Sequence, residues 1–512
     1  MLMGTSSHVG KSILTTALCR IFHQQGRRVA PFKAQNMALN SFVTREGLEM
    51  GRAQVAQAEA AGLRPVVAMN PVLLKPTGEA QSQVIINGRP IGNMSARDYH
   101  LGHKEQAWAA VTAALQALAA QYDTLVIEGA GSPAEVNLRA GDIVNMRVAR
   151  HLQAPVLLVA DIDRGGALAA LVGTLELLDP EERALVKGLV INKFRGDVSL
   201  FTPAIDFLEQ KTGKPVLGVV PYIGDLGIEE EDSVTLEEKA ACTQSSGETA
   251  LSIAVLNLPK LSNFTDFDAL AAEPDVTLHY VATAAELAAG VDGRPWALVI
   301  LPGSKNTSED LLWLRAQGIE PVLQQLHAQG VPLIGICGGY QMLGQELRDP
   351  LQVESAQGTV QGLGYLPAVT TFTGEKLTVQ VRADCAALSF AGQTLTAQGL
   401  MGYEIHMGTT AFTEDIVQPF YVQQADGRQT VDGAVTAEGL VLGTYMHGLF
   451  DDDVFRRQLL NALRVRRGLP ALPPQRNRQR EKEAAYDRLA GIVRTHLDMA
   501  QLVRIMAQGG GR

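Results

Sequence analysis

The sequence has few cysteines, no excess of positive charge and no long apolar run. Its four cysteines, Cys19, Cys242, Cys337 and Cys385, form no CxxC pair, so neither a zinc site nor a disulfide framework is expected. The formal net charge of −10 disfavours nucleic acid and anionic membranes as partners. Because no apolar stretch reaches the roughly 18 residues of a membrane span and the start is not a signal peptide, we expect a cytoplasmic protein.

Length and composition predict a globular protein with several domains. At about 150 residues per domain, a chain of 512 residues corresponds to roughly two to four domains. Apolar residues make up 46% of the chain and charged residues 19%, which is typical of folded proteins with sizeable cores.

Short apolar runs alternate with helical patterns in the N-terminal part of the chain. These runs are rich in β-branched residues and end in Gly, Pro or polar residues, which is typical of buried parallel strands. They cover residues 27–33, 123–131, 154–163, 186–194 and 215–222. The pattern predicts an α/β domain with a parallel sheet over residues 1–235.

A second α/β series follows a small, polar stretch that we expect to be a linker over 236–250. Apolar runs again predict strands, and later runs between residues 377 and 410 resemble antiparallel strands. The first of these runs cover residues 251–258, 275–281, 296–306 and 331–341. We therefore expect a second α/β domain over residues 251–455.

The pattern turns helical near the C-terminus. Residues 455–468 predict one helix, which the prolines of PALPPQ end. Basic and acidic residues alternate over 476–483, and this alternation predicts a helix with a solvated charged face. We assign residues 456–512 to a C-terminal helical extension.

The first motif, GTSSHVGKS at residues 4–12, predicts a phosphate-binding loop. Gly4, Thr5 and Gly10 allow backbone N–H groups to surround a phosphate, Lys11 can reach the β- and γ-phosphates, and the Ser12 hydroxyl can bind Mg²⁺. Gly4 and Gly10 are separated by five residues, one more than in the standard loop. This longer loop resembles that of dethiobiotin synthetase and its relatives, which implies ATP-dependent activation of a carboxylate.

Only three residues precede this loop, so either the first strand is short or the natural chain begins upstream. Further along the chain, Glu128 and Asp161 follow apolar runs, at the strand ends where parallel sheets bind ligands. We expect both carboxylates to hold Mg²⁺, directly or through water. Asn192 and Lys193 lie where related P-loop folds contact the adenine base. A strand-end cap is the alternative for each of these residues.

The second motif, GICGGYQ, places Cys337 at a turn from a strand into a helix. Glycines 338 and 339 permit a tight elbow, which is the geometry of an exposed nucleophile. His447 ends a later strand in the same domain and is the candidate base. Attack on an amide builds negative charge on oxygen, and the backbone N–H groups of Gly303 and Gly338 are candidates for the oxyanion hole.

These motifs resemble the cobyrinic and cobyric acid synthase family of class I glutamine amidotransferases. The resemblance extends from the phosphate loop to about residue 455 and includes INKFRGD, LPGSKNT, GYEIHMG and TYMHGLF. PFKAQNMALNS and MNPVLLKP point to the cobyric acid synthase branch, which amidates cobyrinic acid a,c-diamide.

The resemblance implies ATP- and glutamine-dependent amidation of the b, d, e and g carboxylates of the corrinoid in cobalamin biosynthesis. ATP would form acyl phosphates, and ammonia released at Cys337 would displace the phosphate. The implied cofactors are ATP and Mg²⁺ without a tightly bound prosthetic group, and the implied partners are glutamine and the corrinoid. The oligomeric state stays open.

One position departs from the usual class I pattern. A Glu commonly stands two residues after the histidine, and here that residue is Leu449. The sequence therefore predicts a Cys–His dyad, with some other group orienting the imidazole. Glu404 and His406 in GYEIHMG either help to bind glutamine or line the interface, or they have a structural role.

The corrinoid site should lie where the strand ends of the first domain face the glutaminase. The substrate carries several carboxylates and the acyl phosphate adds charge, so cationic and amide side chains are candidates. They are Lys33, Gln35, Asn36, Asn40 and Lys75.

Two other functions are compatible with the motifs. The first is an a,c-diamide synthase, or an amidotransferase for another polycarboxylate. The second is a non-catalytic P-loop ATPase of the regulatory or partitioning type that carries a vestigial amidotransferase domain. The presence of both Cys337 and His447 argues against the second, since an inactive domain has no reason to keep the pair.

Overall fold

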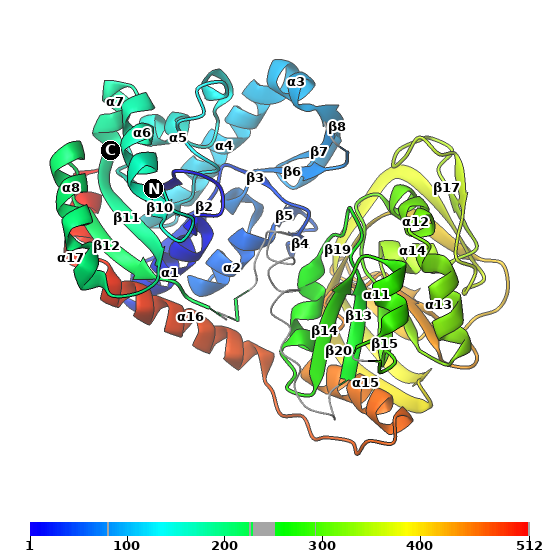
Figure 1. The fold of residues 1–512 in the computed structure, drawn as a ribbon. Helices are drawn as coiled ribbons and strands as arrows, with labels where there is room; N and C mark the ends of the chain where they lie inside the picture. Colours follow the sequence, from blue (N-terminus) through cyan, green and yellow to red (C-terminus); the bar gives the residue numbers. More distant parts are fainter. Residues whose placement is uncertain (79–80, 225–226, 229–250, 292, 510–512) are drawn as a thin grey trace.

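The computed structural model describes residues 1–78, 81–224, 227–228, 251–291 and 293–509. Two α/β units lie side by side, and the C-terminal helices return from the second unit to the first (Figure 1). The expected linker at 236–250 lies outside the described residues. No helix in the described part of the chain is both long enough and apolar enough to cross a membrane.

The N-terminal unit contains the expected parallel sheet. Its main part has the order β1-β10-β11-β12, with all neighbours parallel, and an isolated parallel bridge between Leu2 and Glu128 joins it to the parallel pair β2-β9. The strands are β1 (Leu2–Gly4), β2 (Val29–Phe32), β9 (Thr124–Ile127), β10 (Val156–Asp161), β11 (Val186–Phe194) and β12 (Val216–Pro221). The phosphate loop, Glu128, Asp161 and Asn192 therefore share one edge of the sheet.

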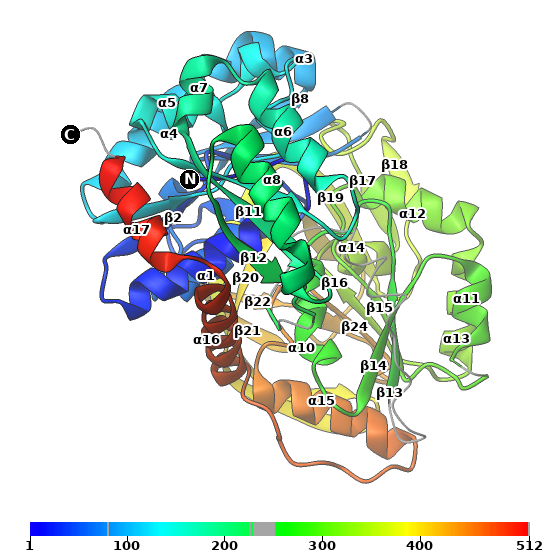
Figure 2. The ribbon, with the colours of Figure 1, turned by 60° about the vertical axis from the view of Figure 1, so that its left-hand side comes forward.

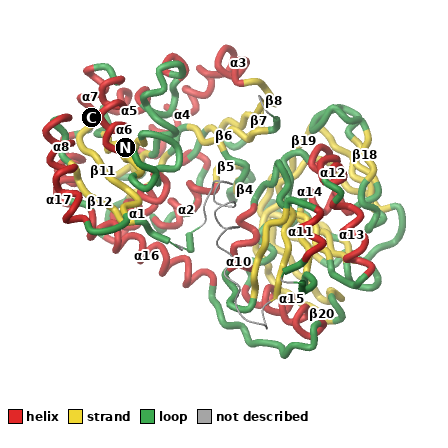
Figure 3. Tube along the Cα trace, viewed as in Figure 1, coloured by secondary structure: helices red, strands yellow, loops and turns green. Residues whose placement is uncertain are grey.

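Helices surround this sheet (Figure 3). They are α1 (Lys11–Gln24), α2 (Arg52–Ala60), α4 (Lys104–Ala119), α5 (Met146–Leu152), α6 (Ala167–Leu177), α7 (Pro180–Leu185) and α8 (Thr202–Thr212). Smaller strands lie towards the second unit: β3 (Gln35–Met37), β4 (Ser41–Val43), β5 (Glu49–Gly51), β6 (Val72–Pro76), β7 (Gln81–Ile86) and β8 (Arg89–Ser95), with the short helix α3 (Ala96–Asp98) after them.

The second unit is built on a six-stranded sheet with the order β14-β13-β15-β16-β24-β23, in which only β23 is antiparallel to its neighbour. Its strands are β13 (Leu251–Leu256), β14 (Val276–Val281), β15 (Leu298–Leu301), β16 (Leu333–Ile336), β23 (Ala434–Val435) and β24 (Val441–Thr444). The helices are α10 (Asp268–Ala271), α11 (Ala284–Ala289), α12 (Thr307–Ala316), α13 (Ile319–Ala328), α14 (Gly338–Leu343) and α15 (Asp453–Arg466).

A second, mostly antiparallel sheet completes this unit. Its centre is the long hairpin of β19 (Ala368–Phe390) and β20 (Gln393–Phe412), which confirms the antiparallel strands expected from the sequence. The other strands are β17 (Glu346–Arg348), β18 (Thr359–Gln361), β21 (Phe420–Gln424) and β22 (Gln429–Asp432). The predicted fold class, two α/β domains with parallel sheets, is thus confirmed.

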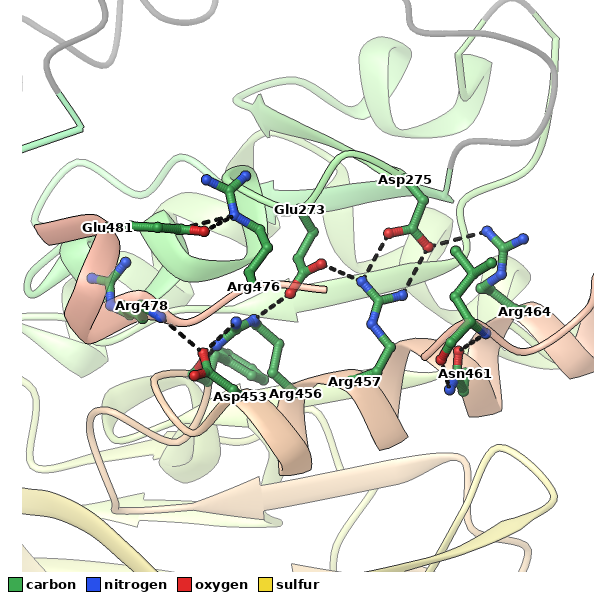
Figure 4. Close-up of polar contacts among 12 residues, drawn as sticks. Glu273, Asp275, Asp453, Arg456, Arg457, Asn461, Arg464, Arg476, Arg478 and Glu481 are labelled. Carbon is green, nitrogen blue, oxygen red and sulfur yellow. Dashed lines mark hydrogen bonds and ion pairs between the residues drawn. The ribbon is translucent and has the colours of Figure 1, made fainter. Parts of the chain in front are cut away.

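Buried charges attach α15 to the second unit (Figure 4). The Arg456 guanidinium is 2% exposed and donates to Glu273 at 2.7 Å, while Arg457 bonds both Glu273 and Asp275. Arg464 adds a bond to Asp275 at 3.1 Å. Because each buried guanidinium faces carboxylates, the burial of charge is compensated along the helix.

The last two helices, α16 (Arg478–His496) and α17 (Met499–Gln508), pack on the N-terminal unit. Figure 2 shows α16 beside α1. The apolar face of α16, which includes Tyr486, Leu489 and Val493, is part of the same core cluster as Leu14 and Leu18 of α1. The extension is therefore a strap from one unit to the other.

The prediction that the charged face of α16 is solvated was wrong in part: Arg480 is exposed, but two other charges pair with the N-terminal unit. Lys482 pairs with Glu59 at 2.6 Å, and Glu483 pairs with Arg20 at 2.8 Å. The charges at 478–483 occupy the first turns of α16, whereas the apolar residues that pack against α1 come later in the helix. The helix is held by both sets of contacts.

Candidate functional site

Cys337 lies at a strained elbow between β16 and α14. Its backbone has φ 51° and ψ −108°, a conformation that a non-glycine residue adopts only when its surroundings impose it. Side chains at the following glycines would collide with the protein: a Cβ at Gly339 would be 1.9 Å from the Leu301 carbonyl oxygen, and one at Gly338 would be 2.8 Å from the Ser304 nitrogen. These close approaches explain why two glycines follow Cys337.

His447 follows β24 and is fully buried beside Cys337. Its Nδ1 lies 2.6 Å from Oδ2 of Asp266, and the other oxygen of Asp266 accepts a hydrogen bond from the Gly448 N–H at 3.1 Å. The ring of Tyr403 stacks on the imidazole, with centroids 5.1 Å apart and planes 15° apart. The imidazole is thus fixed at its edge by a carboxylate and at its face by an aromatic ring.

Asp266 changes the electrostatics of the histidine. Burial by itself lowers the pKa of His447 because it penalises the imidazolium, but the Asp266 carboxylate and the neighbouring Cys337 outweigh burial. The net effect raises the pKa of His447 from 6.5 to about 10. The protonated imidazole is therefore stabilised at neutral pH and can supply a proton to a leaving group.

The expected absence of a third carboxylate was wrong, whereas the expectation that some other group orients the imidazole is met by Asp266. Asp266 orients His447 as a carboxylate does in a triad, although it stands 181 residues before the histidine in the chain. The sequence SNFTDFD at 262–268 contained a signal, since two acidic residues alternate with phenylalanines there. The sequence alone does not show that this turn lies beside His447 and supplies the carboxylate that is missing at Leu449.

Two glycines were expected to form an oxyanion hole, and both border the space around Cys337 and His447. A Cβ at Gly303 would be 3.4 Å from Cε1 of His447. Gly338 is the first residue of α14 and packs against the backbone nitrogen of Ser304. The donor role of the two N–H groups stays a prediction.

The strand β20 passes over Cys337, whose Sγ lies 3.5 Å from the Ile405 carbonyl oxygen. Its neighbours Glu404 and His406 face each other at 3.6 Å, and His406 stacks on Tyr445 with centroids 3.8 Å apart. Both readings of these two residues, glutamine binding and structure, stay open.

The phosphate loop leads into α1 as the motif predicts. Lys11, the first residue of that helix, is 7% exposed, and its ammonium donates to the Ser6 carbonyl at 2.8 Å and to the Gly131 carbonyl at 3.3 Å. Gly10 has φ 93° and lies against Asn192, whose amide donates to the Val9 carbonyl at 2.8 Å. Asn192 therefore braces the loop at the edge where a nucleotide would bind.

The candidate metal ligands form a pair rather than a cluster. The Ser12 hydroxyl lies 2.8 Å from Oε1 of Glu128, so one ion could take both oxygens as ligands. In the described part of the chain no group of three His, Cys, Asp or Glu side chains could hold a metal. The Ser12–Glu128 pair suits Mg²⁺, which uses one or two carboxylates together with waters and phosphates.

Glu128 also accepts bonds from Lys33 at 2.8 Å and from Gln57 at 2.6 Å. Burial raises the pKa of the Glu128 carboxyl, but these partners and Ser12 hold the pKa below its usual value, so the carboxylate stays charged. Asp161, the other expected ligand, contacts Lys193 at 3.0 Å.

The five corrinoid candidates fall into two groups. Lys33 contacts Glu128 at the nucleotide edge, while Gln35 accepts from the Tyr99 hydroxyl and Asn36 donates to Gln54. Asn40 and Lys75 instead lie buried where the two units meet: Asn40 accepts from the Phe264 N–H, and Lys75 donates to Glu49 and Ser41. These contacts favour a structural role for Asn40 and Lys75, and the corrinoid role of the first three stays a prediction.

Comparisons with known proteins agree with this geometry. Residues 252–455 match the model of the CobB/CobQ-like glutamine amidotransferase domain, and residues 1–235 match that of the CobQ/CobB/MinD/ParA nucleotide binding domain. The chain is 55% identical over 508 residues to cobyric acid synthase of Moorella thermoacetica, covering 99% of this chain and 96% of that one. It is also 55% identical to cobyric acid synthase of Pelotomaculum thermopropionicum, covering 100% and 97% respectively.

Proposed function

This chain belongs to the cobyric acid synthase family, and we propose that it converts cobyrinic acid a,c-diamide into cobyric acid by amidating the b, d, e and g carboxylates. It is a glutamine-dependent amidotransferase of cobalamin biosynthesis with a nucleotide-binding domain. The observation that carries the proposal is the Cys337–His447–Asp266 arrangement in the same chain as the Ser12–Glu128 edge. One site can release ammonia, and the other can activate the carboxylate that receives it.

At the first site, the Cys337 sulfur attacks the carboxamide carbon of glutamine. The N–H groups of Gly303 and Gly338 stabilise the negative oxygen of the tetrahedral intermediate. His447 already holds the proton of the thiol as an imidazolium and delivers it to the leaving ammonia, while Asp266 keeps the ring oriented. Water then hydrolyses the thioester to glutamate and restores the thiol.

At the second site, the loop Gly4, Thr5 and Gly10 surrounds the phosphates of ATP, and Lys11 exchanges its carbonyl partners for phosphate oxygens. Ser12 and Glu128 would hold Mg²⁺, which neutralises phosphate charge when it is bound. A corrinoid carboxylate oxygen attacks the γ-phosphorus of ATP, the bond to the β,γ-bridging oxygen breaks, ADP leaves, and an acyl phosphate remains. Ammonia then displaces inorganic phosphate and forms the amide.

The proposal also assigns contacts to the acyl phosphate, the adenine and the metal, and a cellular compartment to the enzyme. Lys33 stands beside Glu128 and is suited to the charge of an acyl phosphate. Asn192 and Lys193 would contact the adenine, and Asp161 would help to hold Mg²⁺, directly or through water. The enzyme acts in the cytoplasm, where its thiols stay reduced.

The substrate is tested by mass spectrometry of the corrinoid. The enzyme is incubated with cobyrinic acid a,c-diamide, ATP, Mg²⁺ and glutamine, and each amidation replaces OH by NH₂. Four successive mass changes are expected. Turnover of unamidated cobyrinic acid without any change of the diamide would contradict the proposal and identify an a,c-diamide synthase.

A further inference from the structure

Two residues of the nucleotide-binding unit reach the loop that holds the catalytic histidine. Oδ1 of Asn40 accepts the backbone N–H of Phe264 at 3.0 Å, and the backbone N–H of Ser41 donates to Oδ1 of Asn263 at 2.9 Å. Asn40 and Ser41 are both fully buried. The same loop carries Asp266, so the unit that uses ammonia holds the carboxylate loop of the unit that produces it.

The contact with Asn263 also fixes the direction of that side chain. Because Ser41 offers an N–H, the Asn263 oxygen must face Ser41 and the amide nitrogen must face the other way. That nitrogen lies 3.4 Å from Nε2 of His447, on the side of the ring opposite Asp266. Asn263 has φ 56°, a left-handed conformation that asparagine tolerates better than most residues.

A third contact reaches the face of the imidazole. The Tyr403 hydroxyl donates to the Ser41 carbonyl at 3.1 Å, while the Tyr403 ring stacks on His447. The backbones of Tyr403 and His447 also exchange hydrogen bonds of 3.2 and 2.9 Å. Asn40 and Ser41 thus support the histidine through its ring face and through the loop that touches both of its nitrogens.

We propose that Asn40 and Ser41 of the nucleotide-binding unit are positioning residues of the glutaminase centre, which is complete only when the two units are docked. They act on glutamine hydrolysis through Asn263, Asp266 and Tyr403, and they touch no reacting atom. The inference rests on the proposed function, since it takes Cys337 and His447 as the glutaminase pair.

The main variant is Asn40→Ala, and the matched control is Thr378→Val. The control also removes one hydrogen bond between the units, from the Thr378 hydroxyl to the Gly47 carbonyl at 2.8 Å, but away from the 263–266 loop. A misplacement of about 1 Å can lower a rate about 100-fold. We therefore expect Asn40→Ala to lower kcat for glutamine hydrolysis by about 10- to 100-fold, and Thr378→Val to leave it unchanged.

Three readouts separate positioning from general damage. The KM for glutamine should stay close to the wild-type value in Asn40→Ala, because the glutamine contacts are not touched. Amidation driven by free ammonia should also stay close to wild type. The thermal midpoints of the Asn40→Ala and Thr378→Val proteins should both lie above the assay temperature, so that a lower kcat is not due to unfolding.

A second variant keeps the inference testable if Asn40→Ala does not fold. Tyr403→Phe removes only the hydroxyl that reaches Ser41 and keeps the stacked ring. It should lower kcat for glutamine hydrolysis by roughly 3- to 10-fold, the equivalent of one hydrogen bond, with ammonia-driven amidation intact. Full glutaminase activity in Tyr403→Phe, or in Asn40→Ala, would overturn the inference.

A covalent probe separates the failure of the inference from the failure of the proposed function. The probe is a diazoketone analogue of glutamine, and the labelled peptide is identified by mass spectrometry. Wild type should be labelled at Cys337, and Asn40→Ala should be labelled more slowly. Equal labelling of Cys337 in both proteins would overturn the inference alone, whereas no labelling of wild-type Cys337 would overturn both.

Discussion

The two proposed reaction centres of this chain are built in opposite ways. At Cys337 the backbone is strained, and the histidine is held by Asp266 and Tyr403. At the nucleotide edge the charged groups bind protein atoms instead: Lys11 bonds backbone carbonyls, and Glu128 bonds Lys33. The first centre is arranged for reaction before any ligand arrives, while the second must exchange internal contacts for contacts with ATP.

The comparison indicates that the nucleotide edge, and not the glutaminase centre, depends on ligand binding for its final geometry. Preorganised groups cost no reorganisation when the reaction occurs, so the fold alone sets the glutaminase geometry. Helix α2 lies between the two centres: its first residue, Arg52, donates its N–H to the Asn40 carbonyl at 3.4 Å, and Gln57 bonds Glu128. The same helix thus contacts both the support of the glutaminase and the metal edge.

The largest effect on the rate of glutamine hydrolysis is expected when the carboxylate that orients His447 is removed. Asp266→Asn should lower glutamine hydrolysis by about 10³- to 10⁴-fold, as loss of the orienting carboxylate does in triads. Ammonia-driven amidation should stay near wild type, and Asp268→Asn in the same turn is the control. Steady-state glutamate release measures the effect. A decrease of less than tenfold would show that His447 needs no orienting carboxylate.

A substitution at the nucleotide edge is expected to slow amidation with either nitrogen source, unlike Asp266→Asn. Glu128→Gln removes a charge that faces Ser12 and Lys33, and it should slow amidation by about 100-fold or more. The loss should be the same with glutamine and with free ammonia as nitrogen source. If glutamine-driven amidation alone declined, the assignment of Glu128 to the second centre would be wrong.

A smaller effect tests the strap that connects the units. Leu489 is fully buried in the core shared by α16 and α1, and Leu489→Ala should reduce the free energy of unfolding by about 2–5 kcal/mol. Exposed Leu200, which is 81% exposed, provides the control Leu200→Ala. Thermal or denaturant unfolding measures both. Equal stability of the two variants would mean that α16 does not hold the N-terminal unit.

The last prediction concerns the pH dependence of stability. Because pairing raises the pKa of His447 from 6.5 to about 10, its contribution is fully present below pH 6.5 and is lost as the pH rises through about 10. The stability difference between wild type and Asp266→Asn should therefore be larger at pH 6 than above pH 10. A difference that grows with pH would contradict the ion pair.

Local patterns in the sequence predicted the parallel sheets, the phosphate loop and the elbow at Cys337, because each depends on neighbouring residues. Asp266 was missed because its role arises only when two distant turns meet. The contacts of Asn40 and Lys75 where the units meet could not be predicted, because residue type does not reveal burial. The contacts of α16 were missed for the same reason, since a charged face can pair with another domain as well as with water.

The most direct test crosses two variants with two nitrogen sources. Cys337→Ser should lose amidation with glutamine and keep it with free ammonia, whereas Lys11→Ala should lose amidation with both. Mass spectrometry of the corrinoid product reads all four combinations. Loss of ammonia-driven amidation in Cys337→Ser, or amidation with ammonia by Lys11→Ala at the wild-type rate, would contradict the account of two separate centres.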